Sequence, residues 1–306
     1  MQLLKTFPSK LISGVLLMLA SWHAYASVDA ATSLRARYQS LLPTLENNVF
    51  GAPLHIESED SQGRIRGAIF GVVYHDLDAL HAMVTSPAEW CEMLLIHPNI
   101  KYCAHQGNSN GDIVLTIYAG SKNYTTVQDA RRSEYRVRVD TSQRGYLVAN
   151  VSADRGALDT SEYRLMLEAV PIDDGDTFVH VNFSYRYGPM TRALTATYFS
   201  TLGRNKVGFS VIDKDREGKP IFVRGRTASL ERTVMRTYLA LQTWLEGQGK
   251  PADDRFEWRL RRWYFLTERY PRQLYKFKED EYVDVKRRER ANALPVQGDT
   301  GSPAKG

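Results

Sequence analysis

Five short runs rich in β-branched and aromatic residues lie between residues 112 and 187, and they constrain the fold more than any other feature. They cover residues 112–119, 134–140, 146–152, 162–170 and 177–187. Turn-forming clusters separate them, for example at 143–145 and 173–176. No helical pattern stands between the runs, so repeated β-α-β units are not indicated. The pattern predicts an antiparallel sheet.

The last of these runs alternates most clearly. One side of it carries Val179, Val181, Phe183, Tyr185 and Tyr187, and the other carries Phe178, His180, Asn182, Ser184 and Arg186. Such alternation is typical of a strand with one face on the core and the other in water. His180 could pair with Glu168 as an acid and a base across the last hairpin. Its place in the alternation, however, predicts that it faces solvent.

Helical patterns flank the predicted sheet. A helix over 33–46, a strand over 64–74 and two short helices come first, and Asp76 and Ser86 can cap the short helices. A helix over 190–202, a small hairpin and the strongest helix, 228–246, follow the sheet. Its apolar stripe consists of Leu230, Val234, Tyr238, Leu241 and Leu245. A helix capped by Asp253 or Asp254 and a charged helix over 280–291 complete the series.

The first 26 residues have the features of a secretory signal peptide. Lys5 and Lys10 precede a short apolar run over 11–20, and residues 24–26 (Ala-Tyr-Ala) match a small-x-small cleavage site. We therefore expect secretion across the inner membrane of a Gram-negative bacterium and a soluble periplasmic protein after cleavage. The alternative is a signal that stays uncut as an anchor.

The rest of the chain divides into four parts. We expect an N-terminal helix and lead-in over 27–63, and a main domain over 64–250 with an insert at 203–225. A helical C-terminal extension over 251–292 and a disordered tail over 293–306, rich in Gly, Ser and Pro, follow. Because 43% of the residues are hydrophobic, the chain can build a sizeable core.

Charge is distributed unevenly along the chain. Residues 27–200 contain 15 Lys and Arg against 20 Asp and Glu, whereas residues 201–292 contain 22 against 14. Five arginines lie in one predicted helix beside Trp258, Trp263 and Tyr264; they are Arg255, Arg259, Arg261, Arg262 and Arg269. Such basic C-terminal helices could make peripheral contact with a membrane, although we favour packing on the main domain. For an exported protein, nucleic acid is not an expected partner.

The order of elements resembles the helix-grip fold of the START and Bet v 1-like (SRPBCC) superfamily. The stretch VVYHDLDALHAMVTSPAEWCEMLLIHPNIKYC is similar to that fold's first strand, its helix pair around a tryptophan and the entry to its second strand. The stretch GALDTSEYRLMLEAVPIDDGDTFVHVNFSYRYG is similar to its last hairpin. The resemblance covers residues 64–247 and suggests an exported bacterial member.

The resemblance implies an α+β fold in which a curved antiparallel sheet wraps on a long C-terminal helix, here with extra C-terminal helices. The insert at 203–225 and the helices after Pro251 depart from the superfamily's pattern and bear on how open any cavity is. Most members carry hydrophobic small molecules or lipids between sheet and helix, and a minority are cyclases or hydrolases. The resemblance therefore implies a lipid-binding or hydrophobic-ligand protein without a cofactor.

Aromatic side chains are the best candidates for contact with such a ligand, because aromatic walls with a few hydroxyls suit an apolar molecule with one polar end. The candidates are Trp90, Tyr163, Phe183, Tyr185 and Tyr198. An ordinary packed core would use the same residues. A cyclase- or hydrolase-type enzyme and a structural periplasmic domain with a packed core are therefore the alternatives.

The motifs of common catalytic and metal sites are missing from the sequence. It contains no G-x-S-x-G, H-E-x-x-H or Walker motif, so no catalytic residue is assigned. Cys91, His97, Cys103 and His105 are not spaced like a compact zinc site, so no metal ligand is assigned. In an oxidising compartment two cysteines usually pair. We predict a disulfide between Cys91 and Cys103 that ties the short helix pair to the edge of the sheet.

Overall fold

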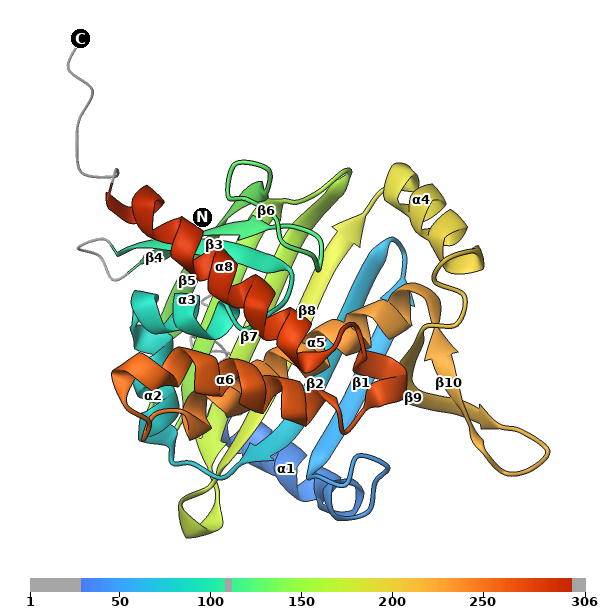
Figure 1. The fold of residues 1–306 in the computed structure, drawn as a ribbon. Coiled ribbons are helices and arrows are strands. Elements are labelled where there is room, and N and C mark those ends of the chain that lie inside the picture. The colour runs from blue at the N-terminus through green and yellow to red at the C-terminus, as the bar shows by residue number, and fades with distance from the viewer. Residues whose placement is uncertain (1–28, 108–111, 299–306) are drawn as a thin grey trace, which may run out of the picture.

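A computed structural model describes residues 29–107 and 112–298 as an α+β fold built on one large antiparallel sheet (Figure 1). The sheet has eight strands in the order β1-β2-β8-β7-β6-β5-β4-β3. They are β1 Leu54–Ser61, β2 Arg64–Val73, β3 Ile100–Gly107, β4 Ile113–Ala119, β5 Arg131–Asp140, β6 Leu147–Arg155, β7 Thr160–Pro171 and β8 Thr177–Tyr187. Each of the sequence-predicted runs is a strand, so the predicted antiparallel sheet is confirmed.

The helices also follow the predicted order. They are α1 Ala30–Glu46, α2 Leu77–Thr85, α3 Pro87–Leu94, α4 Pro189–Ser200, α5 Gly225–Glu246, α6 Ala252–Thr267, α7 Pro271–Leu274 and α8 Glu279–Gly298. The insert forms a separate hairpin of β9 Val207–Lys214 and β10 Pro220–Arg224. The side chains of Asp76 and Ser86 cap α2 and α3 as expected. The N-cap residue of α6 is instead Pro251, no side chain caps this helix, and Asp253 and Asp254 lie in its first turn.

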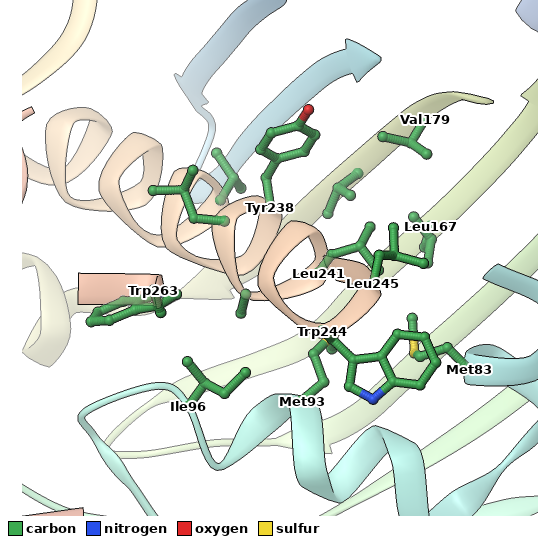
Figure 2. Close-up of a cluster of buried hydrophobic side chains, with 14 of the residues drawn as sticks. Met83, Met93, Ile96, Leu167, Val179, Tyr238, Leu241, Trp244, Leu245 and Trp263 are labelled. Atoms are coloured by element: carbon green, nitrogen blue, oxygen red, sulfur yellow. The ribbon is translucent and has the colours of Figure 1, made fainter. Parts of the chain in front are cut away.

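The core lies between α5 and one face of the sheet. All five residues of the predicted stripe on α5 are buried, and Figure 2 shows Tyr238, Leu241 and Leu245 beside Leu167 and Val179 of the sheet. Two glycines of β2 allow this close approach: a Cβ at Gly71 would lie 2.8 Å from the Tyr238 ring, and one at Gly67 would lie 3.0 Å from Leu230. The long helix is therefore held directly against the strands.

The opposite face of the sheet is only partly open to water, which corrects the expectation of a wet face. Leu34 and Leu41 of α1 are buried in one cluster with Phe70 and Phe178. His180 lies in the same region and is 6% exposed, so the prediction that it faces solvent is wrong. The alternation was correct, but it could not show that a helix from outside the main domain would cover this face.

Strand β1 was not predicted, because the sequence placed its residues in a lead-in. It pairs with β2 along its whole length, and it forms one edge of the sheet. The second half of β1 is charged and polar, with Glu57, Glu59 and Asp60. Charged residues are common on edge strands because they discourage pairing with other chains. They also remove the apolar alternation by which a strand is recognised.

The C-terminal helices cover α5 and the other edge of the sheet. Leu260 and Trp263 of α6 are buried, which confirms that this helix packs on the main domain. Helix α8 crosses β3 (Figure 1). There Glu289 accepts hydrogen bonds from Lys101 Nζ at 2.6 Å and Lys286 Nζ at 2.9 Å, and all three side chains are buried. Helix α8 extends to Gly298, so residues 293–298 are helical and not part of a disordered tail.

Cys91 of α3 and Cys103 of β3 form the predicted disulfide, with Cα atoms 5.3 Å apart. Because β3 is an edge strand, the bond ties the short helix pair to the edge of the sheet. The predicted signal peptide and residues 299–306 lie outside the described residues. Among the helices that are described, none combines the length and the apolar character needed to cross a bilayer.

Candidate ligand-binding site

An apolar cavity of about 280 Å³ lies between α5, α3 and strands β4 to β8. Each element that surrounds it contributes small or apolar side chains. The walls include Leu115, Tyr135, Val151 and Leu165 from the sheet, and Thr233, Thr237 and Ala240 from α5. We call this space the apolar cavity. Its position, between the sheet and the gripping helix, is the one expected from the sequence.

Three of the five predicted ligand contacts line the apolar cavity: Trp90, Tyr163 and Phe183. The Trp90 indole Nε1 donates a hydrogen bond to the carbonyl of Val84 at 2.8 Å, which leaves its apolar ring for the cavity wall. Tyr185 does not line the cavity but stacks on Tyr163, with ring centroids 5.1 Å apart. Tyr185 therefore supports the wall and does not form it.

Tyr198 lies apart from the other four. It belongs to α4, which projects beyond the end of β8 (Figure 1). Its hydroxyl accepts a hydrogen bond from Lys206 Nζ, and the Lys206 ammonium also lies 5.0 Å from the centre of its ring. Tyr198 lines a second pocket, described below, and not the apolar cavity.

Few polar groups interrupt the cavity wall. The Tyr163 hydroxyl is already engaged, since it donates to Thr160 Oγ1 at 2.9 Å. Burial raises the pKa of Tyr135 to about 12, so this phenol is neutral at physiological pH. Thr233 and Thr237 donate their hydroxyls to carbonyls one turn earlier in α5, at 3.1 and 3.0 Å. The wall can thus offer hydroxyl oxygens to a ligand without carrying charge.

His97 stands at one end of the apolar cavity and was not among the predicted contacts. Its Nδ1 accepts a hydrogen bond from the backbone N–H of Asn99 at 3.2 Å. Burial, with the nearby charges of Lys276 and Arg236, holds the pKa of His97 well below its usual value. The ring is therefore neutral at pH 7, and the proton lies on Nε2 because Nδ1 is an acceptor.

A second pocket, of about 660 Å³, adjoins the first, and His97, Asn99 and Thr233 line both. It is formed by α5, by the residues that follow α4, and by α7 with the segment after it. Its lining contains six cationic side chains: Lys122, Lys206, Arg232, Arg236, Arg272 and Lys276. Among the described residues that line it, none is Asp or Glu. We call this space the basic pocket.

Nothing in the sequence singled out the basic pocket. Arg232 and Arg236 lie one turn apart on α5, at the spacing of an ordinary solvated helix face. Both are nevertheless buried, with 7% and 6% exposure. The insert and the C-terminal extension cover this face. The two features that depart from the superfamily's pattern therefore create the pocket.

The pair of the half-buried Glu168 and the buried His180 lies outside both pockets. His180 Nδ1 is 2.7 Å from Glu168 Oε1, and the Tyr146 hydroxyl donates to Glu168 Oε2 at 2.7 Å. The His180 ring also stacks on Phe70 with 4.1 Å between centroids. Phe70 and Tyr146 also belong to the buried cluster that includes residues of α1. Within residues 29–107 and 112–298, no group of three His, Cys, Asp or Glu is placed to bind a metal ion.

No family model and no curated protein matches the sequence. Solved structures with a similar fold include a protein of Thermus thermophilus, with 8% identity over 61% of this chain and 99% of that one, and a TM-score of 0.39. A second is the Zhui aromatase/cyclase of a Streptomyces species, with 11% identity over 66% of this chain and 95% of that one, and a TM-score of 0.35. A third is human StAR-related lipid transfer protein 5, with 13% identity over 56% of this chain and 88% of that one, and a TM-score of 0.31. The likeness concerns the fold alone.

The topology itself decides the fold. The first and last strands of the main domain, β2 and β8, are neighbours, the helix pair α2–α3 separates β2 from β3, and α5 lies against the sheet. The chain has an α+β helix-grip fold, as the sequence led us to expect. Strand β1, the β9–β10 hairpin and the helices from α6 onward are additions to it.

Proposed function

We propose that the protein binds a hydrophobic small molecule, or the apolar part of a lipid, in the cavity between α5 and the sheet. The observation that carries this proposal is the cavity itself, an apolar space in the middle of the fold, walled by Trp90, Tyr163 and Phe183. Ligand pockets are typically concave and apolar with a few placed polar groups. A structural domain with a filled core would not need this space.

The size of the cavity limits the ligand. At about 280 Å³ it is near the lower end of the range of about 300–1,000 Å³ for small-molecule pockets. A single short acyl chain or a compact ring system suits that volume, whereas both chains of a phospholipid do not. We therefore expect a single-chain or ring-shaped apolar group.

The polar lining favours binding over the cyclase- or hydrolase-type enzyme. Acid–base catalysis needs titratable groups directed at the reacting atoms. The titratable side chains among the described residues of the cavity wall are His97, Tyr135 and Tyr163, and none of them is a carboxylate. Tyr163 is engaged with Thr160. A carrier or binding protein needs no more than these groups provide.

Filling the cavity tests the proposal. In Thr237→Phe the new ring should occupy the space beside α5 and reduce the affinity for 1-decanol at least about tenfold, because the ligand's apolar contacts are lost. Thr197→Phe on α4 is the matched control, since both threonines donate to the carbonyl four residues earlier in a helix. Isothermal titration calorimetry measures both. Equal affinity of the two variants and the wild type would overturn the proposal.

We further propose that the ligand is bound in the periplasm, after removal of residues 1–26. The basic start, the apolar run over 11–20 and the Ala-Tyr-Ala sequence support this. Amino-terminal sequencing of the protein from a cell envelope fraction should begin near Ser27. A mature protein that keeps Met1 would contradict it.

Contact of the basic C-terminal helices with a membrane stays a prediction. On α6, Arg261 and Arg262 are paired with Glu257 and Glu246, and Phe265 is 57% exposed. If α6 touches a membrane, Phe265→Ser should lower co-sedimentation with anionic vesicles. Unchanged co-sedimentation would count against this contact.

A further inference from the structure

The basic pocket gathers positive charge that the protein itself does not neutralise. None of its six cationic side chains forms an ion pair within the part of the chain that the structure describes. Lys276 Nζ donates to Asn99 Oδ1 at 2.9 Å, and Lys122 Nζ donates to the carbonyl of Lys276 at 2.7 Å. These partners are neutral, so they accept hydrogen bonds from the two lysines but do not compensate their positive charge.

The missing counter-charge is costly in free energy for Arg236, because this side chain is buried. One Nη2 hydrogen bond reaches the carbonyl of Leu274 at 3.4 Å, and its Nε has no hydrogen-bond partner. Burial, and then the charge of Arg232, lowers the pKa of Arg236 to about 9. A buried charge without a partner is costly, and so is a buried donor without an acceptor. An oxyanion in the pocket would satisfy both needs.

The nearest carboxylate on α5 does not supply that compensation. Glu231 is fully buried and accepts hydrogen bonds from the backbone N–H groups of Phe209 and Ser210, and from the hydroxyls of Ser58 and Ser210. It joins α5 to β1 and β9. Burial lowers the pKa of Arg232, and the charge of Glu231 opposes this only in part, because the two side chains form no ion pair.

The apolar cavity and the basic pocket are next to each other. His97, Asn99 and Thr233 line both, so only these side chains stand between the two spaces. The neutral His97 and Asn99 form the boundary between apolar and charged surroundings. One molecule with an apolar part and an anionic group would match both spaces.

We propose that the basic pocket is an oxyanion subsite, and that the ligand of the apolar cavity is an amphiphile whose phosphate or carboxylate group is bound by Arg236 and Lys276. This rests on the proposed function, since the amphiphile's apolar part occupies the apolar cavity. Arginine binds phosphate and carboxylate oxygens with paired N–H groups, which suits a buried oxyanion. Lys122, Lys206 and Arg272 add positive charge around the entrance.

Four probes separate the contributions of the two spaces: decyl phosphate, decanoate, 1-decanol and inorganic phosphate. Each is titrated calorimetrically into the full chain and into Arg236→Met, Lys276→Met and Arg272→Met. Lys214→Met is the control, because Lys214 is exposed on β9 and lines neither pocket. Arg272→Met, at an exposed position of the pocket, is included in case the change at the buried Arg236 disturbs folding.

Decyl phosphate should bind at least about tenfold more tightly than 1-decanol, because charged hydrogen bonds are stronger than neutral ones. Arg236→Met and Lys276→Met should remove that advantage and leave 1-decanol binding unchanged. The control Lys214→Met should change neither affinity. Inorganic phosphate should bind weakly and be displaced by decyl phosphate.

Other results would overturn different parts of the proposal. Equal affinity for decyl phosphate and 1-decanol, unaffected by the three variants, would overturn the oxyanion subsite and leave the proposed function standing. Binding of inorganic phosphate that decyl phosphate does not displace would show a site for a free anion and overturn the link to an amphiphile. Failure of decyl phosphate, decanoate and 1-decanol alike to bind would overturn the proposed function as well.

Discussion

Lys276 has surroundings that an ammonium group would not normally occupy. The charges that act on it are those of Arg236, Lys206, Arg232 and Lys122, all of the same sign. Burial and these charges lower the pKa of Lys276 from 10.5 to about 7. Such an arrangement lowers the stability of the unliganded protein, and proteins keep such features where a ligand uses them.

Replacement of this lysine should therefore stabilise the empty protein. Between pH 7 and 10.5 the unfolded chain binds the Lys276 proton and the folded chain does not, so this group makes stability rise with pH in that window. We expect Lys276→Met to raise the free energy of unfolding at pH 6 by about 1 kcal/mol or more. The gain should shrink as the pH rises from 7 towards 10.5, and it should vanish above 10.5, where the lysine is neutral in the unfolded chain too.

Thermal unfolding of the wild type and Lys276→Met between pH 6 and 10 measures this effect. Lys214→Met, at an exposed position, should follow the wild type at every pH. A purely structural role for Lys276 predicts the opposite sign, with the variant less stable at pH 6. That result would contradict our view of the pocket as an unfilled cationic site.

At the scale of elements, the C-terminal helices stabilise the edge of the sheet. Helix α8 covers β3, and the buried carboxylate of Glu289 holds Lys101 of the strand and Lys286 of the helix. Burial lowers the pKa of Lys286 to about 8, against the opposing attraction of Glu289. An edge strand with unpaired backbone groups is a site for aggregation unless something covers it. The triad of Glu289, Lys101 and Lys286 and the Cys91–Cys103 disulfide both hold strand β3.

Loss of the central carboxylate should separate these elements. Glu289→Gln leaves two buried ammonium groups without a counter-charge, and we expect it to lower the free energy of unfolding by about 3–5 kcal/mol. Asp284→Asn on the same helix removes an exposed ion pair with Arg287 and should cost less than about 1 kcal/mol. Urea unfolding at pH 7 compares them. Similar losses for both variants would show that the triad does not anchor α8.

At the scale of the whole molecule, the sequence predicted the part of the fold that follows from local patterns. The alternating strands, the capped helices α2 and α3 and the stripe on α5 each depend on residues close in sequence, and each is present. Strand β1 was missed because charged residues replace its alternation. His180 was misplaced because α1 covers it from a distant part of the chain.

The candidate site was likewise predicted only in part. Trp90, Tyr163 and Phe183 were predicted because they belong to the apolar faces of recognisable elements, and all three line the apolar cavity. The cations of the basic pocket come from the β4–β5 connection, the segment before β9, α5 and α7 with the segment after it. No local pattern relates these segments. Only tertiary packing shows that their charges meet and lack partners.

A structure of the protein in complex with decyl phosphate tests the central claim most directly. The account predicts that the alkyl chain lies between α5 and the sheet, against Trp90 and Phe183, and that the phosphate lies beside Arg236 and Lys276. The Thr237→Phe variant, treated in the same way, should show no alkyl chain in that space. A chain bound only on the outer surface, with the apolar cavity empty in the wild type, would contradict the account.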